Sequence, residues 1–252
     1  MLLYHAASSY YSMIARLALR EAGVAYDERR LDIHRAKEQL APWYVAINPH
    51  MTVPTLVEGP AVWRDSRDIL AVAAARAGAA WEPPSAASEA VVAAHYAIPI
   101  ERLTFARMMT RLPPLRFLFP RLLRRIVRDL EAELPTAADP SAVRAKIAVN
   151  RERIAYFGGG DLRDKLEAER AHVRRFLAAL PAPVDLLFGP RPSSADIVTA
   201  VLLSRLRMIG EWALTAARGD IAAYLDRMAA RPAFAAADVW TRFQLRRLLA
   251  GK

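Results

Sequence analysis

The turn from Ser9 to Ser12 holds the residues with the clearest capacity for chemistry. Ser9, Tyr10, Tyr11 and Ser12 place four hydroxyls at the start of an amphipathic segment that ends at Gly23. The pattern predicts a helix that begins near Ser12, whose unpaired backbone N–H groups would point at the same place. A hydroxyl donor and the positive end of a helix together stabilise an anion such as a thiolate. The turn is therefore predicted to bind and activate an anionic ligand atom.

No cysteine occurs among the 252 residues. A chain without cysteine forms no disulfide and offers no thiolate of its own for exchange chemistry, so a reactive sulfur at the turn must belong to a cosubstrate. Soft-ligand metal sites are excluded for the same reason, and the histidines have no ligand spacing, so we predict no metal site. The histidines are His5, His34, His50, His95 and His172.

An α/β arrangement is predicted for the elements that position this turn. Short apolar runs alternate with amphipathic stretches, and glycine or proline separates many of them. The pattern predicts strands at 2–4, 26–33, 54–57 and 61–63, and helices at 12–22, near 37–44 and from 66. Their order, βαβαββα, is typical of a thioredoxin-like domain. We place this domain at residues 1–80.

The second half of the chain is predicted to be all-helical. A linker rich in small residues and proline spans 78–88, and no strand-like alternation of comparable length follows it. Signals for helix starts occur at Ser85, at Asp139 before Pro140, at Asp161 after three glycines, and at Ser193 with Asp196. The expected fold class is α/β plus all-α, with a thioredoxin-like N-terminal domain at 1–80 and a helical-bundle C-terminal domain at 86–252.

Four segments resemble the glutathione S-transferase superfamily. Within it, residues 12–24 and 44–48 are most similar to the tetrachlorohydroquinone dehalogenase and zeta-like (maleylacetoacetate isomerase) branch. The segments are residues 12–24, 44–48, 189–197 and 224–234. The resemblance implies a homodimer that uses glutathione as cosubstrate and builds a pocket for a hydrophobic electrophile in its helical half. Candidate lining residues are Tyr96, Phe105, Met108 and Met109, although an apolar stripe at helical spacing is usually core.

The resemblance also assigns roles within the turn. Ser9 matches the catalytic serine of theta-like and zeta-like members, and Tyr11 matches the dehalogenase cysteine. We rank Ser9 first and Tyr11 second as the group that stabilises the glutathione thiolate. Ser12 is expected to be the N-cap of the helix and to lie against the cosubstrate. Because Tyr11 replaces the cysteine, reductive dehalogenation through an enzyme–glutathione disulfide is disfavoured.

Two further motifs match the superfamily's glutathione-binding residues. Pro54, after Thr52 and Val53, matches a cis proline, which would turn the Val53 backbone toward the cysteinyl backbone of glutathione. Asp65 and Ser66 match the acidic–serine pair that holds the γ-glutamyl end. The carboxylate suits the ammonium group, and the hydroxyl and helix N–H groups suit the ligand carboxylate.

One departure from the pattern concerns the glycyl carboxylate of glutathione. Many relatives read Asn-Pro-x-Gly-Lys before Val-Pro, whereas this chain has Asn48 to Thr52 without a lysine. A replacement contact is left open among four residues. They are His34, Arg35, Lys37 and Gln39.

Composition and motifs leave two classes of function. The first is a glutathione transferase that conjugates or isomerises a hydrophobic electrophile. The second is a noncatalytic scaffold of the same fold that binds a protein or an anionic membrane partner. At 54% apolar residues the chain can form two modest cores, and no apolar run is long enough for a membrane span. No secretory signal precedes the first strand, so a cytoplasmic location is expected.

Positive charge is concentrated in an insertion at about residues 112–134. Residues 101–131 carry eight arginines against three acidic residues, and the tail from Arg242 adds three arginines and one lysine without an acid. Apolar residues and arginines are interleaved between Pro113 and Leu134, which predicts a basic amphipathic helix with a candidate break at Pro120.

Three interpretations of this helix stay open. The interpretation that we favour is a solvated helix packed over the substrate pocket. The second is a helix that makes peripheral contact with an anionic membrane surface, and the third is a helix that binds an acidic partner. Nucleic acid is not an expected partner, because no reading module is present and arginine alone gives salt-sensitive, nonspecific attraction.

Overall fold

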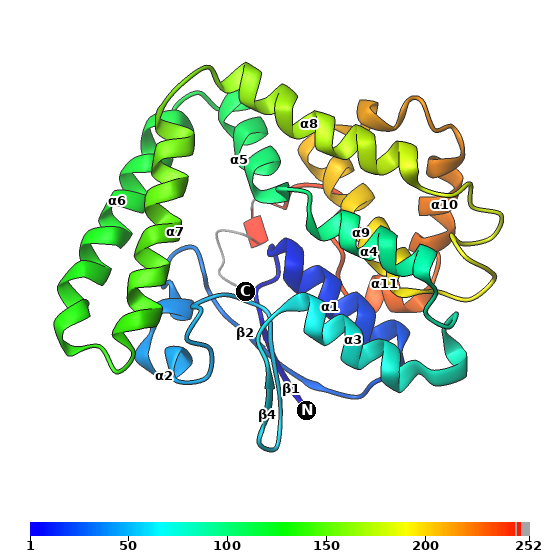
Figure 1. Ribbon diagram of the computed structural model, residues 1–252, viewed down its shortest axis with the longest axis horizontal. Helices are drawn as coiled ribbons and strands as arrows, with labels where there is room; N and C mark the ends of the chain where they lie inside the picture. The colour runs from blue at the N-terminus through cyan, green and yellow to red at the C-terminus, as the bar shows by residue number, and fades with distance from the viewer. Residues whose placement is uncertain (245, 248–252) are drawn as a thin grey trace. The chain divides into compact units, whose positions relative to one another are not determined.

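The computed structural model describes residues 1–244 and 246–247. Figure 1 shows its helices and strands, most of them labelled. The strands are β1 (Leu2–His5), β2 (Asp27–Arg30), β3 (Thr55–Glu58) and β4 (Ala61–Trp63). The helices are α1 (Tyr10–Glu21), α2 (Pro42–Val45), α3 (Ser66–Ala77), α4 (Ala86–Tyr96), α5 (Ile100–Arg111), α6 (Leu115–Glu133), α7 (Pro140–Gly158), α8 (Leu162–Ala179), α9 (Ser194–Ile209), α10 (Asp220–Ala229) and α11 (Pro232–Ala236).

Two compact units make up the described chain. The first contains residues 1–41 and 52–98 and the described residues from 173 onward, and the second contains 42–51 and 99–172. Each unit thus combines segments from both halves of the sequence. The division into domains at 1–80 and 86–252 stays a prediction. No described helix has the length and apolar character needed to cross a bilayer.

The sheet of the first unit has the strand order β2-β1-β3-β4. β1 and β2 are parallel, while β3 is antiparallel to both β1 and β4. α1 and α3 pack against each other beside this sheet (Figure 1). The predicted order βαβαββα and the predicted fold class are confirmed, and every described element after α3 that is regular and longer than one turn is helical.

The start of α1 differs from the prediction. The helix begins at Tyr10, and its N-cap is Ser9 rather than Ser12. Ser9 has an extended backbone and its hydroxyl accepts the N–H of Ser12 at 3.3 Å. The Ser12 side chain is fully buried and accepts the N–H of Ala6 at 3.3 Å. Both serines suit a cap, and the burial of Ser12 decides between them.

Other predicted boundaries also shift. The expected helix near 37–44 is split into a 3-10 turn, Glu38–Leu40, and the short α2, because Ala41 is extended before Pro42. β2 is shorter than predicted, and a Ser85–Ser88 capping box starts α4 inside the expected linker. α6 continues through Pro120 without a break.

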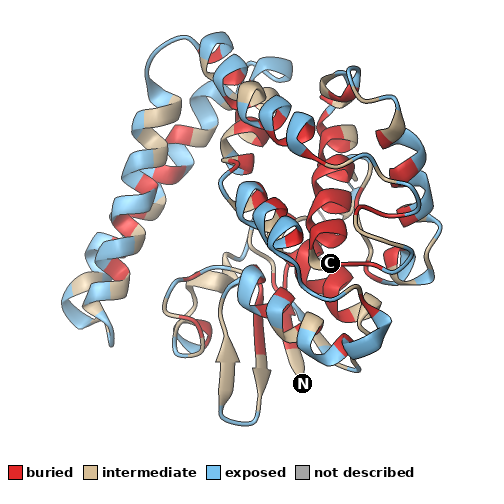
Figure 2. Ribbon diagram, turned by 45° about the vertical axis from the view of Figure 1, so that its right-hand side comes forward, coloured by how far each residue is buried: buried red, intermediate tan, exposed pale blue. Residues whose placement is uncertain are grey.

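The helices of the two units differ in how far they are buried. Every α9 residue except Ser194 and Arg207 is buried, and a Ser193–Asp196 capping box begins the helix as predicted. In the second unit, α6 and α7 pack against each other through single apolar stripes and expose their other faces (Figure 2). The stripe of α6 includes Leu123 and Val127.

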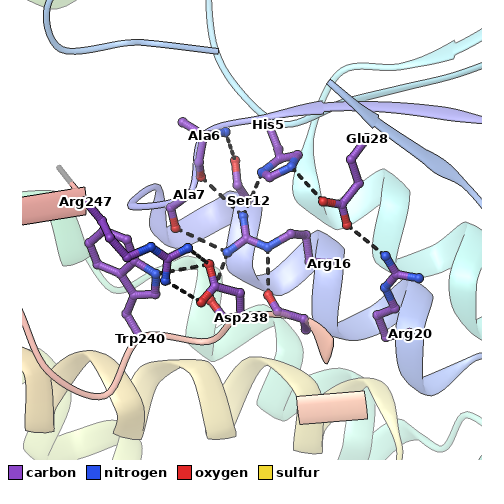
Figure 3. Close-up of polar contacts among 11 residues, drawn as sticks. His5, Ala6, Ala7, Ser12, Arg16, Arg20, Glu28, Asp238, Trp240 and Arg247 are labelled. Carbon is purple, nitrogen blue, oxygen red and sulfur yellow. Dashed lines mark hydrogen bonds and ion pairs between the residues drawn. The ribbon is translucent and has the colours of Figure 1, made fainter. Parts of the chain in front are cut away.

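A buried arginine ties the start of α1 to the end of the described chain. Arg16 donates to the carbonyl oxygens of Ala6, Ala7, Ala237 and Asp238 at 2.7–3.3 Å (Figure 3). Its Nη1 also donates to His5 Nδ1 at 2.8 Å. Burial lowers the pKa of Arg16 to about 10, so the guanidinium stays charged at neutral pH.

The acceptors around Arg16 have partners of their own. His5 Nε2 lies 3.3 Å from Glu28, which accepts from Arg20 at 2.9 Å. The Asp238 carboxylate accepts from Trp240 and from Arg247 (Figure 3). Burial, followed by the nearby Arg16 charge, lowers the pKa of His5 to about 4.

We predict that Arg16→Met lowers the free energy of unfolding by about 3–5 kcal/mol, because several buried acceptors lose their donor at once. Arg20→Met removes an arginine from the same helix, but its ion pair with Glu28 is partly exposed, so a loss within about 1 kcal/mol is expected. Urea unfolding of the three proteins measures the difference. Equal losses in the two variants would show that the buried network contributes no more than a surface pair.

Candidate functional site

The strand register brings four segments together at one end of the sheet, where the strands begin or stop. We call this end of the sheet its edge. Tyr4 pairs with Thr55, so the end of β1 lies beside the start of β3. His5 pairs with Arg30 at the end of β2, and Trp63 at the end of β4 pairs with Leu56. The edge therefore carries residues 6–9, 31–34, 53–54 and 64–66. Six of the eight predicted site residues lie on or next to these segments, and the other two, Tyr11 and Ser12, lie in the first turn of α1.

The cis peptide bond predicted at Pro54 is present between Val53 and Pro54. Pro54 is buried, and Val53 is half-buried. Within the described chain, neither the N–H nor the carbonyl of Val53 makes a hydrogen bond. An extended peptide could pair with both groups as an added strand. Thr52, the residue before, is exposed.

Ser9 combines a structural and a chemical capacity. Its hydroxyl oxygen accepts the Ser12 N–H, which leaves the hydroxyl proton available as a donor. The residue is half-buried at the positive end of α1. An anion beside Ser9 would therefore meet both an O–H donor and a helix N-terminus.

Asp65 and Ser66 begin α3. Asp65 is the N-cap, and its exposed carboxylate accepts the N–H of Arg67 at 2.7 Å. The N–H of Ser66 has no partner in the described chain, and its side chain is buried. Its hydroxyl forms a 3.0 Å hydrogen bond with the hydroxyl of Tyr96. Tyr96, at the end of α4, thus reaches the predicted ligand site.

An aromatic cluster links Tyr96 to the turn before α1. The ring of Tyr96 stacks on Tyr11, with centroids 6.3 Å apart and planes 7° apart. Tyr11 packs edge-on against Tyr10, whose hydroxyl shares a 2.6 Å hydrogen bond with His95 Nε2. Ser66 is therefore connected through Tyr96 to the aromatic side chains that directly follow Ser9 in the chain.

Burial controls ionisation in this cluster. It lowers the pKa of His95 to about 3 and raises the pKa of Tyr10 well above its usual value. Burial likewise raises the pKa of Tyr96. At neutral pH the two tyrosines and the histidine are uncharged, so within this cluster they act through hydrogen bonds and stacking.

A second histidine approaches the turn from the segment after β2. His34 Nε2 lies 2.8 Å from the hydroxyl of Ser8, and burial lowers the pKa of His34. Arg205 of α9 donates to the carbonyl of Ser8 at 3.1 Å and lies over the Tyr10 ring. From the sequence, His34 is predicted only as a candidate for a carboxylate contact. Its pairing with Ser8 joins residues 26 positions apart and has no local signal.

Lys146 of α7 is a further residue that sequence patterns do not indicate. In the second unit it donates to the carbonyls of Met51 at 2.8 Å and His50 at 3.4 Å. Burial, followed by repulsion from Arg153, lowers its pKa to about 8. The Lys146 ammonium group therefore holds the loop at His50 and Met51, in which this chain lacks the lysine that many relatives have. Gln39, another candidate, donates instead to the carbonyl of Ile33.

The proposed pocket-lining residues separate into two groups. Tyr96 joins the cluster at the turn. Phe105 stacks on Phe119 at 4.4 Å and contacts Phe157 edge-on at 6.1 Å, so it belongs to a half-buried aromatic cluster of the second unit. Among the described residues, no group of three or more His, Asp or Glu side chains could hold a metal ion.

Comparison with known proteins agrees with this arrangement. The family model for the glutathione S-transferase N-terminal domain matches residues 3–83. The tetrachloro-p-hydroquinone reductive dehalogenase of Sphingobium chlorophenolicum is 29% identical over 94% of this chain and 95% of its own length. Residues 3–83 therefore form a glutathione S-transferase N-terminal domain, and the chain as a whole resembles that superfamily. This relative confirms the predicted similarity to the tetrachlorohydroquinone dehalogenase branch of the superfamily.

Solved glutathione S-transferase structures share the fold. A family member from Pseudomonas fluorescens Pf-5, with two glutathione molecules bound, matches 94% of this chain and 92% of its own at a TM-score of 0.63 and 15% identity. A maleylpyruvate isomerase, a bacterial zeta-class glutathione S-transferase, matches 94% of this chain and 96% of its own at a TM-score of 0.56 and 22% identity.

The buried His95 predicts that this protein is sensitive to acid. Its pKa is about 3 when folded, against about 6.5 in the unfolded chain, so below pH 6.5 the unfolded state binds the extra proton. Stability is therefore full above pH 6.5 and falls toward pH 3. Between pH 7 and 4 we expect His95 alone to remove about 3 kcal/mol.

His95→Gln, which keeps a hydrogen-bonding partner for Tyr10, should lose clearly less stability over this range. Some dependence will remain, because the pKa of His5 is also lowered. His172→Gln, an exposed change on α8, is the control and should behave as the wild type. Urea unfolding at pH 7, 5.5 and 4 tests this. Identical slopes for all three proteins would contradict the assignment.

Proposed function

We propose that this chain is a glutathione-dependent enzyme that conjugates or isomerises a hydrophobic electrophile. The observation that carries the proposal is the meeting of three features at one sheet edge. They are the Ser9 hydroxyl at the start of α1, the unpaired Val53 backbone before cis Pro54, and the Asp65–Ser66 start of α3. Each suits a different part of the tripeptide.

The γ-glutamyl end is assigned to the start of α3. The Asp65 carboxylate suits the ammonium group, since its cap to Arg67 uses only one of its acceptor sites. The ligand carboxylate takes the N–H of Ser66 and the positive end of the helix. The Ser66 hydroxyl can still donate to it if Tyr96 donates to Ser66.

The middle of the ligand is assigned to Val53. Its unpaired N–H and carbonyl suit the cysteinyl backbone, which would add to the sheet edge as a short strand. This pairing directs the cysteinyl side chain along the edge. The assignment of the sulfur to the start of α1 follows from the neighbouring position of residues 6–9.

Ser9 then stabilises the thiolate. A free thiol has a pKa of about 8.5, and lowering it by two units requires roughly 2.7 kcal/mol of preferential stabilisation. A hydrogen bond to a charged group contributes about 1.5–3 kcal/mol, and the helix N-terminus adds to it. Ser9 with α1 is sufficient for this task without a further charge. Tyr11 is the second candidate.

The reaction class follows from the missing cysteine. The dehalogenase relative is named for reductive chemistry, but we match Tyr11 to the cysteine of the dehalogenase branch, and this chain has no cysteine. Chemistry in which only glutathione supplies sulfur therefore suits this chain better. Conjugation and reversible addition followed by isomerisation both meet that condition. A homodimer and a cytoplasmic location remain predictions.

A noncatalytic scaffold is the second candidate function. The contact of Tyr96 with Ser66 favours it, since the tyrosine hydroxyl already occupies part of the hydrogen-bonding capacity expected for glutathione. The absence of a lysine between Asn48 and Val53 points the same way. Binding of glutathione distinguishes the two candidates.

We predict that Asp65→Asn weakens glutathione binding about tenfold or more, equivalent to about 1.4 kcal/mol, because the ammonium group loses its counter-charge. Asparagine retains the N-cap, so α3 should be unaffected. Asp68→Asn removes the same charge from the first turn of α3, three residues after the N-cap, and should leave glutathione binding unchanged. Titration calorimetry measures all three. If the wild type gives no binding heat up to tens of millimolar glutathione, the scaffold is correct.

Ser9→Ala should raise the pKa of bound glutathione by about one unit or more, through loss of a hydrogen bond to a charged group. Ser9→Thr keeps the hydroxyl and should restore the wild-type value, which separates the donor from the packing of the cap. Tyr11→Phe should have a smaller effect. Ultraviolet absorbance of the thiolate during a pH titration gives these values. A larger shift in Tyr11→Phe would make Tyr11 the donor instead.

A further inference from the structure

The second unit contains a basic hollow that the proposed function does not use. Its cavity of about 240 Å³ lies between the end of α5, the first half of α6 and the loop that joins α7 to α8. Arg116, Arg121 and Arg124 of α6 line one side, and Lys165 of α8 lines another. Among its lining residues there is no Asp or Glu. The hollow is therefore an isolated concentration of positive charge.

The arginines of the hollow lack acidic partners within the described chain. Arg121 makes only a long contact, 3.4 Å, to the carbonyl of Phe117. No ion pair or hydrogen bond joins the Arg116 or Arg124 side chain to another described residue. Three other arginines of the same unit form ion pairs with glutamates, so the lack of acidic partners is specific to the hollow. The pairs are Arg102–Glu152, Arg151–Glu131 and Arg153–Glu101.

Apolar groups adjoin these charges. Met109, Phe157 and Leu162 form part of the lining, and Phe117 lies at the hollow with 65% of its surface exposed. A phenylalanine this exposed beside unpaired arginines is unusual for a purely solvated helix face. Together the lining suits a molecule that is anionic at one end and apolar at the other.

The loop between α7 and α8 leaves room for such a molecule. Gly158, Gly159 and Gly160 line the hollow without side chains, and Gly160 has a positive φ of 68°. Lys165 donates to the carbonyls of Tyr156 and Gly159, so it closes the end of α7 and holds this loop. α7 ends at Gly158, the first of these three glycines.

We propose that this hollow binds the phosphate or carboxylate group of an anionic amphiphile, with the arginines of α6 on the anion and the apolar wall on the adjoining carbons. Arginine forms paired hydrogen bonds with such groups. The cavity is smaller than the roughly 300–1,000 Å³ of pockets that enclose drug-sized ligands. It accommodates a head group and a few carbons, and a longer chain would extend past Phe117.

The test uses octyl phosphate as the probe, with inorganic phosphate and octanol as its two halves. At low salt, octyl phosphate should bind more tightly than either half. Arg121→Gln/Arg124→Gln should weaken its binding about tenfold or more, because two charge-assisted contacts are lost. Raising the salt to physiological strength should weaken wild-type binding, since the arginines are exposed.

Arg125→Gln/Arg128→Gln is the matched control. It removes the same charge from the same helix, but neither residue lines the hollow, and Arg125 lies 4.0 Å from Asp129. We expect octyl phosphate binding in this variant within about twofold of the wild type, since distant surface charge is screened. Circular dichroism and thermal unfolding check that both variants keep the fold.

Two results would overturn the proposal. One is no binding of octyl phosphate at low salt, and the other is an equal loss in both double variants, which would assign binding to net charge. Sedimentation with phosphatidylcholine vesicles containing phosphatidylglycerol identifies the source of the anion. Binding to the vesicles that is lost only in Arg121→Gln/Arg124→Gln indicates a bilayer lipid. Binding of octyl phosphate without vesicle binding supports a free organic anion.

Discussion

A single buried guanidinium determines where the predicted chemistry can occur. Arg16 is 1% exposed and carries a charge at neutral pH, so its desolvation must be offset by hydrogen bonds. It finds them on the turn at Ala6 and Ala7 and on the chain end at Ala237 and Asp238. The turn that leads to Ser9 is therefore fixed by residues more than 220 positions away.

The same constraint explains why the turn can serve two purposes. Because Ser12 accepts the N–H of Ala6, the chain is closed on itself before the helix begins. Ser9 is then left to cap α1 while its proton stays available. A cap held by tertiary contacts can donate to a ligand without loss of the helix start. A cap held only by local contacts would have to exchange one partner for the other.

Tyr96 adds a second constraint on any ligand at this edge. A serine hydroxyl has one proton and two acceptor positions, so Ser66 can serve Tyr96 and a carboxylate together only if Tyr96 is the donor. Burial keeps the tyrosine protonated, which is the state this requires. The stacked Tyr11 holds the ring in place. Access to Ser66 thus depends on α4 as well as on α3.

Local features of this chain could be predicted, and tertiary contacts could not. The strands, the cis bond at Pro54 and the capping box at Ser193 depend on residues within a few positions, and all were found. The choice between Ser9 and Ser12 as the cap failed, because both residue types suit the position and only burial separates them. Tyr96 contacts Ser66, 30 positions away, and Lys146 contacts Met51, 95 positions away. The periodicity of a sequence does not indicate contacts over such separations.

The charges of the basic insertion also show that tertiary contacts could not be predicted from the sequence. Its helix and amphipathic character could be predicted, but the sequence does not separate matched arginines from unmatched ones. Packing between α6 and α7 rests on apolar residues such as Leu123 and Ile147, while exposed ion pairs contribute little to stability. Folding therefore gives no reason for arginines at 116, 121 and 124, whose mutual repulsion is slightly unfavourable. Their position around a hollow with an apolar wall is explained if the charges act on a ligand rather than on the fold.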